Sequence, residues 1–270
     1  YDTGDERLLI DGTEQSPLVL KDAEGSVIQT QTLTYIPQQK RMELRGRSSA
    51  TFPVRERADE EAQPLQAEWA DRCVLLLSDG GLEQLAVQRA QLVGNVRITH
   101  PSVRLSSQAL GLELDTDAAS TQPADASSRM QLRRLTARGD VDCVIIDDQE
   151  QTQSIQADRL RLDTAVDDQG RLYPRQIFAD GQLVRASDGQ QTLVARTIHA
   201  ILAPAAASGD ATTQPTARIV LEKLIASDSA EYSRADGQRA AADRIEVVQQ
   251  GDQPTITLLG NASIGDGNNI

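Results

Sequence analysis

The stretch Gln91–Leu114, QLVGNVRITHPSVRLSSQALGLEL, contains the pattern that predicts the fold of the whole chain. In its first half, Leu92, Val96 and Ile98 share one side of an alternating strand whose other side is mainly polar. His100-Pro101-Ser102 interrupts this alternation, because proline has no backbone donor and favours a turn. Apolar alternation then resumes as far as Leu114, so the stretch predicts a β-hairpin with one apolar face and one polar face.

Two half-units of this kind recur along the chain. One half-unit is a small residue flanked by alternating apolar residues, and it occurs at Gly46, Gly94, Gly139, Gly181 and Gly260, with a degenerate copy at Asp228. The other places an alanine three residues before an apolar pair, and it occurs at Ala70, Ala109, Ala157, Ala195 and Ala242. These alanines are 38 to 48 residues apart, so each period is two strands joined by turns of variable length.

The middle of each strand is expected to bend. Ala157 and Leu160 are an odd number of residues apart, so both can face inward only across a bulge or bend, and the shared Ala-Asp-Arg sequence marks its position. Small residues at strand centres also allow a sheet to curl. The curled sheet encloses either a filled core or an apolar trough, and the scarcity of Phe and Trp favours the trough modestly. The inward-facing candidates are Leu92, Val96, Ile98, Val141, Cys143, Ile145, Leu160, Leu162 and Leu183.

Composition excludes several classes of protein. The chain has 270 residues, of which 39% are hydrophobic and 25% charged, as in folded soluble domains. Aromatic residues make up only 3%, too few for a carbohydrate-binding platform or for the aromatic girdles of an outer-membrane barrel. The net charge of −13 repels nucleic acid and anionic membranes, and the sequence contains no evident basic patch. We therefore expect no nucleic-acid partner.

No catalytic, metal or cofactor motif is present. The two histidines, His100 and His199, lie in a turn and in a strand, and no spacing suggests zinc. Adjacent carboxylates such as Asp147-Asp148 are expected to be solvated turn residues, since no calcium loop surrounds them. No phosphate-binding or nucleophile motif occurs, so we predict no enzyme and no cofactor. Cys73 and Cys143 are read as buried apolar side chains, with a disulfide as the alternative in an oxidising compartment.

Three segments are predicted to be loop insertions within one single domain, residues 1–270. They are rich in proline, charge or small polar residues, and they span residues 53–68, 116–129 and 203–217. The sequence contains no run of about 18 apolar residues, which is the length that a helix needs to span a bilayer. The chain begins at Tyr1, so we expect the mature part of an exported protein whose signal or anchor segment is not included.

The paired signatures resemble those of the periplasmic bridge proteins of lipopolysaccharide transport, the LptA/OstA-like or organic-solvent-tolerance-like family. The resemblance covers roughly Thr30 to Ile264. The residues that carry it are Leu92-Val93-Gly94-Asn95-Val96, Ala137-Arg138-Gly139-Asp140-Val141, Ala179-Asp180-Gly181-Gln182-Leu183, Ala157-Asp158-Arg159-Leu160 and Ala242-Asp243-Arg244-Ile245. LptC-like proteins and the N-terminal part of LptD-like proteins are possible members as well.

This resemblance implies an all-β fold, an elongated and twisted β-jellyroll of stacked V-shaped antiparallel strands with an apolar interior and little or no helix. It also implies a non-enzymatic protein of the periplasm of a Gram-negative-type bacterium, which binds lipopolysaccharide or a similar lipid in a groove and passes it toward the outer membrane. Like-folded transport components, or a second copy, would pair with strand edges near Leu18–Tyr35 and Ile256–Ile264. Two alternatives stay open: a structural or adhesive β-repeat scaffold with a filled core, and a hydrolase or lyase on a β-helix, whose shorter period fits poorly.

Overall fold

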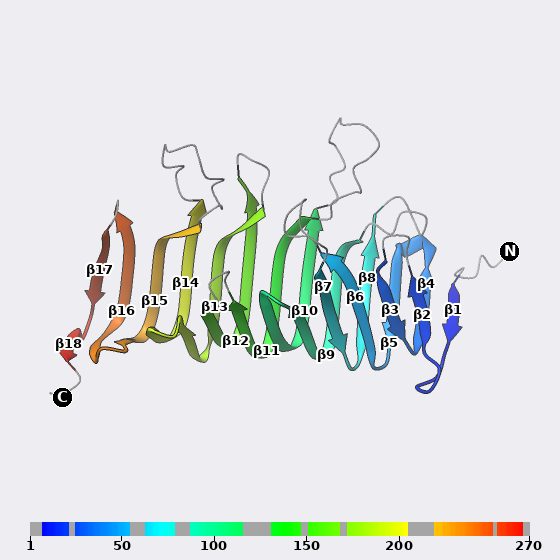
Figure 1. The fold of residues 1–270 in the computed structure, drawn as a ribbon, viewed down its shortest axis with the longest axis horizontal. Coiled ribbons are helices and arrows are strands. Elements are labelled where there is room, and N and C mark those ends of the chain that lie inside the picture. Colours follow the sequence, from blue (N-terminus) through cyan, green and yellow to red (C-terminus); the bar gives the residue numbers. More distant parts are fainter. Residues whose placement is uncertain are drawn as a thin grey trace. The chain divides into compact units, whose positions relative to one another are not determined.

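The structure is a computed structural model that describes residues 7–21, 25–54, 63–78, 87–115, 131–146, 151–167, 172–204, 219–250 and 253–266. The chain divides into two compact units, Tyr1–Gln149 and Glu150–Ile270. In these ranges the only helical element is one 3-10 turn, η1 (Pro37–Gln39), and the strands pair antiparallel (Figure 1). The all-β prediction is therefore confirmed, whereas the single-domain prediction stays a prediction. No helix among the described residues has the length and apolar character that crossing a membrane requires.

The first unit contains β1 to β11. Its strands are β1 (Leu8–Asp11), β2 (Leu18–Lys21), β3 (Val27–Thr30), β4 (Thr32–Ile36), β5 (Arg41–Arg45), β6 (Ser48–Val54), β7 (Gln63–Trp69), β8 (Arg72–Leu77), β9 (Val87–His100), β10 (Val103–Asp115) and β11 (Gln131–Ile146). The second unit contains β12 (Thr152–Val166), β13 (Leu172–Ser187), β14 (Gln191–Pro204), β15 (Ile219–Arg234), β16 (Gln238–Gln250), β17 (Gln253–Leu259) and β18 (Ser263–Asp266).

Each long strand from β9 to β16 contains one corner, which we define as the point where its pairing register shifts near the middle. Between β9 and β10, the paired residues change from Val93 opposite Ala109 to Val96 opposite Ser107, so β9 contributes one residue more than β10. The strands with the glycine half-unit, β9, β11, β13 and β15, contribute the extra residues at every such shift. An extra residue on one strand bends it, and Figure 1 shows β15 and β16 changing direction at this point.

Left-handed backbone conformations produce most of these corners. Gly94 and Asn95 have φ angles of 91° and 47°, and Gly139 and Asp140 repeat the pair with 75° and 48°. At the degenerate copy, Asp228 and Ser229 adopt 66° and 64° without a glycine. Short polar side chains such as Asp and Asn tolerate this region better than other non-glycine residues. The degenerate copy is thus a true corner.

Glycine is required at Gly94 because the neighbouring strand passes close to it. A Cβ atom built on Gly94 would lie 2.7 Å from the backbone nitrogen of Asp71. Two hydrogen bonds hold the strands at this separation: the N–H of Ala70 donates to the carbonyl of Gly94 at 2.6 Å, and that of Asp71 donates to Val93 at 3.1 Å. The corner therefore depends on the absence of a side chain.

The alanine half-unit supplies the other side of the corner. Ala157 and Leu160 are both buried, with 7% and 4% of their surface exposed, because the register shifts between Gln156 and Arg159. Asp158 lies at this shift, and its Oδ2 accepts a hydrogen bond of 2.8 Å from the backbone N–H of Gln182. The prediction that Ala-Asp-Arg marks the bend is confirmed at this position.

The corners separate two walls in each unit, which we call the long wall and the short wall. In the first unit, β4, β5, β8 and residues 87–93, 109–115 and 131–138 belong to the long wall, and β1 pairs with β4. The short wall contains β2, β3, β6, β7 and residues 96–100, 103–107 and 141–146. In the second unit, the long wall contains residues 159–166, 172–180, 197–204, 219–227, 244–250 and β17, and the remaining segments form the short wall.

The predicted insertion at residues 53–68 is partly wrong. β6 continues through Val54 and β7 begins at Gln63, with Pro53 directly opposite Pro64. Ala67 and Trp69 face the interior and are 5% and 3% exposed, and this burial outweighs the charged composition of the segment. Residues 55–62, the segment 116–129 and residues 205–217 lie outside the described residues, whereas 203 and 204 end β14.

Candidate functional site

The inner faces of the two walls form the candidate functional site. In the first unit, Leu92 lies on the long wall of β9 with 5% of its surface exposed. On the short wall, Val96, Val141 and Cys143 are 0%, 2% and 8% exposed. Ile98 is half-buried, and Ile145, near the end of β11, is 38% exposed. All six of these predicted residues share the alternation phase of the interior.

In the second unit, one predicted inward residue is wrong. Leu160 is buried and Leu162 is half-buried on the long wall, as expected. Leu183 is 59% exposed, and the adjacent Val184 is 0% exposed in its place. The cause is the corner of β13, where the five residues from Asp180 to Val184 lie opposite the three from Ala195 to Thr197. The extra residues of β13 shift the inward-outward alternation of its side chains by one residue. Counting every second residue from Ala179 predicts Leu183 as inward and does not reveal this shift.

On β11, β13 and β15, the size of the inward side chains increases away from the corner. Ala137, Ala179 and Ala226 are the inward residues nearest the corner on the long-wall segments of β11, β13 and β15, and each is at most 1% exposed. Two residues further from the corner lie the larger side chains Leu135, Ile177 and Leu224. Alanine lets two walls approach closely where they meet, and larger aliphatic residues fill the widening space.

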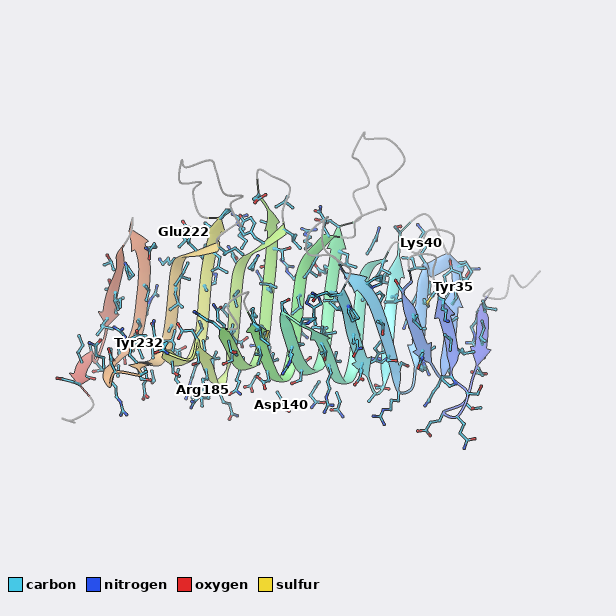
Figure 2. All side chains as sticks on the ribbon, viewed as in Figure 1. Tyr35, Lys40, Asp140, Arg185, Glu222 and Tyr232 are labelled. Carbon is cyan, nitrogen blue, oxygen red and sulfur yellow. The ribbon has the colours of Figure 1, made fainter. Side chains whose placement is uncertain are left out.

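Exposure follows the same gradient. The inward residues beside the corner are buried, whereas on six of the long strands the next inward residue along the long wall is only half-buried, and these residues are Leu112, Leu135, Leu162, Ile177, Leu224 and Val247. On β9 and β14 the corresponding residues, Ala90 and Ala200, are buried. These aliphatic side chains face inward and are still partly accessible to solvent, and we call this partly exposed inner surface the groove. Figure 2 labels Tyr232 on the short-wall segment of β15 and Glu222 on its long-wall segment, at opposite ends of the strand.

The N-terminal part of the first unit is filled instead. There the inward positions carry large residues, and Tyr35, Met42, Leu44, Trp69 and Leu77 are all no more than 8% exposed. Even Tyr35 and Met42, which lie toward the end of the long wall away from the corner, are buried. The groove therefore belongs to the strands from β9 onward in the first unit and to the second unit.

Few polar groups face the interior. Ser48 donates a hydrogen bond of 3.0 Å to Thr30, so these two buried hydroxyl groups satisfy each other. The Nδ1 of His100 lies 2.8 Å from the hydroxyl oxygen of Ser102, at the end of the short wall. An interior with so few polar groups offers no selectivity for polar ligands.

Both cysteines are free and buried, so the disulfide alternative is wrong. Burial raises the pKa of the Cys73 thiol from 9.0 to about 12. Burial, with a smaller effect of the Asp142 charge, raises the pKa of Cys143 to about 11. Thiols that stay protonated at neutral pH are poor nucleophiles, and both side chains act as small apolar residues.

The described residues contain no group of three or more His, Cys, Asp or Glu side chains placed to bind a metal ion. His199 lies on the outer side of β14, where its ring contacts Phe178 edge to face at 6.1 Å between centroids.

A polar recess of about 590 Å³ lies outside this groove, on the first unit. Its lining includes Gln29, Arg47, Glu68, Asn95 and Arg97, near the corners of the short wall. Sequence reasoning missed the recess, because these side chains come from three strands, β3, β7 and β9, and from the turn between β5 and β6, which are separate in the sequence. Positive and negative side chains are mixed in it, so its charge favours neither anions nor cations.

Sequence reasoning also missed most of the alanines that form the floor of the groove. Of the interior residues of the second unit, Ala195, Ala200, Ala226, Ala230 and Ala242 are at most 8% exposed. The alanine half-unit is the sequence signal that could have located them. It indicates where the strand bends, but it does not by itself indicate that the alanine side chain lines the interior.

Comparison with known proteins gives one distant structural match. No family model matches the sequence, and no curated protein matches it. Among solved structures, one match is LptH, the LptA-homologous periplasmic component of the lipopolysaccharide transport device from Pseudomonas aeruginosa. It is 15% identical, the match covers 59% of this chain and 94% of that chain, and the TM-score is 0.34. A likeness at this level carries no argument about function.

Proposed function

We propose that the inner faces of the two walls bind the acyl chains of a lipid, without catalysis, and hold them during transfer through the periplasm. The observation that supports this most is the row of half-buried, inward-facing aliphatic residues on strands β10 to β16. The resemblance of the corner motifs to lipopolysaccharide-transport proteins makes lipopolysaccharide, or a similar lipid, the proposed ligand.

The free energy of transferring an acyl chain allows the protein to hold a lipid but does not drive the lipid in one direction. An acyl chain of about twelve carbons gains on the order of 10 kcal/mol when it leaves water, at about 0.8 kcal/mol per methylene. The same chain gains almost nothing when it moves from a bilayer into an apolar groove. A passive groove therefore suffices for transit, and any direction must come from another component.

Like-folded domains are the proposed partners. Among the described strands, β1 pairs with β4 alone and β2 with β3 alone, while β17 and β18 both pair with β16 alone. Their other edges offer backbone donors and acceptors to an added strand. Ile256 and Ile264 are 53% and 82% exposed at the C-terminal edge, and a neighbouring domain would cover them.

A scaffold with a filled core is the second candidate, and the filled interior at Tyr35, Met42 and Trp69 favours it for the start of the first unit. The two candidates differ in whether lipid is bound by the later strands. In the scaffold, no added hydrocarbon should enter between the walls.

Adjacent residues of β13 provide a matched test. Ile177 faces inward and is half-buried, whereas Phe178 faces outward and is 39% exposed. Purified from a Gram-negative envelope and examined by native mass spectrometry, the wild-type protein and Phe178→Asp should carry lipid, and Ile177→Asp should not. Circular dichroism verifies that each variant is folded. Equal lipid loading of the folded Ile177→Asp and Phe178→Asp variants, or no lipid on the wild type, would contradict the proposal.

A further inference from the structure

The outer face of the long wall in the first unit is basic, although the chain carries a net charge of −13. Its outward positions from β5 to β11 hold six arginines against three carboxylates, Glu43, Glu113 and Asp115. The arginines are Arg41, Arg45, Arg72, Arg89, Arg134 and Arg138, and we call this surface the arginine face. The sequence-based expectation of no basic patch is wrong here, because antiparallel pairing gathers residues that are up to 97 positions apart.

The strand register orders these side chains in two rows. One row crosses the strands through Arg45, Arg72, Val93, Ala109 and Arg138. The other row crosses through Arg41, Leu76, Arg89, Glu113 and Arg134.

Between the two rows runs a lane of mostly small or uncharged residues, Glu43, Val74, Gln91, Gly111 and Thr136. The rows are four residues apart along each strand, or about 13 Å, since a strand rises about 3.3 Å per residue. This width accommodates an extended polypeptide.

Two carboxylates of the same chain already form ion pairs on the arginine face, each with two arginines. Glu43 contacts Arg41 at 3.1 Å and Arg45 at 2.7 Å, so one carboxylate lies between two guanidinium groups. Glu113 likewise lies 3.7 Å from Arg89 and 3.6 Å from Arg134. This spacing of guanidinium groups is therefore suited to carboxylates.

Two arginines have no such partner. No carboxylate of the described residues lies within ion-pair distance of Arg72 or Arg138, and both are exposed. Arg72 is also directly opposite Arg45 in the register. Like charges directly opposite each other destabilise a sheet, and an external anion between them would remove that cost.

The outer face of the long wall in the second unit does not share the positive charge of the arginine face. The outer face of its long wall carries Arg159, Arg161, Lys223 and Arg244 together with Asp163, Asp180 and Glu246, so its charges nearly balance. Ion pairs within that face join Arg159 to Asp180 and Arg161 to Asp163.

We propose that the arginine face docks an extended, acidic polypeptide segment of a partner protein, whose carboxylates pair with Arg72 and Arg138. Arginine is suited to this role because its planar guanidinium group binds carboxylates in bidentate fashion. The acidic remainder of the chain does not prevent the contact, because repulsion is screened beyond about 8 Å at physiological ionic strength. This site is independent of the lipid groove on the opposite side of the wall.

A dye-labelled decaglutamate peptide tests the proposal by fluorescence anisotropy against the full chain. We expect saturable binding that weakens as salt is raised, and a loss of about tenfold or more in affinity for Arg72→Glu/Arg138→Glu. The control Arg185→Glu changes an exposed arginine on the short wall of the second unit and should bind like the wild type.

Three outcomes would overturn it: no peptide binding by the wild type at low salt, equal weakening by Arg185→Glu, or unchanged binding in the double variant. Vesicles containing phosphatidylglycerol and a single-stranded oligonucleotide distinguish the other polyanions. If either binds through Arg72 and Arg138 while the peptide does not, the partner is not an acidic polypeptide.

Discussion

Replacing Gly94 by alanine tests whether close strand approach, and not backbone conformation alone, fixes the corners. At a φ of 91°, an alanine costs about 1–2 kcal/mol wherever it is placed. At Gly94 the new Cβ would also lie 2.7 Å from the backbone nitrogen of Asp71 and 2.8 Å from its Cβ. The strands must separate, which weakens the hydrogen bonds of Ala70 and Asp71 at about 1 kcal/mol each. The expected total is about 3–4 kcal/mol.

Gly25 is the matched control because its φ is 92° and an added Cβ would have no atom within 4 Å. Gly25→Ala should therefore cost only the conformational part, about 1–2 kcal/mol. In urea denaturation followed by circular dichroism, the midpoint of Gly94→Ala should lie about 1 M below that of Gly25→Ala, for an m-value of about 2 kcal/mol/M. If the two variants unfold at the same urea concentration, close approach does not determine the corner.

Two further predictions concern the cysteines and the C-terminal edge. Because burial raises the pKa of Cys73 to about 12 and that of Cys143 to about 11, iodoacetamide at pH 8 should label neither thiol in the native protein but both in urea. Labelling of the native protein at pH 8 would show instead that the thiols are accessible. Both folded-state pKa values exceed the usual 9.0, so the stability that the two thiols contribute is complete below pH 9 and falls as the pH rises toward 12. Ile264→Lys at the C-terminal edge should lower self-association in sedimentation velocity, whereas a change at the outward, 39% exposed Phe178 should not.

The corners were the most predictable part of the fold. Glycine and alanine half-units report a steric requirement that is local to a strand and its neighbour, so Gly94, Gly139 and Ala157 could be read from the sequence alone. Even the degenerate corner at Asp228 was located, because Asp and Ser can adopt left-handed conformations without glycine.

Residues just past a corner were less predictable. The position of Val184 in place of Leu183 depends on how many residues β13 inserts opposite β14, and that number differs between corners. The arginine face was missed for a related reason. Its charges meet only through the pairing of five strands, and net charge counted over the whole chain conceals a local excess of the opposite sign.

Because each strand contacts chiefly its immediate neighbours, both units grow by simple addition. The corner contacts of Gly94 with Ala70 and Asp71, and of Asp158 with Gln182, connect adjacent strands only. Inserting one more two-strand period would lengthen a unit by about 10 Å while its cross-section stays the same. The length of a unit can therefore change in steps of one two-strand period, and unfolding should begin at the terminal strands.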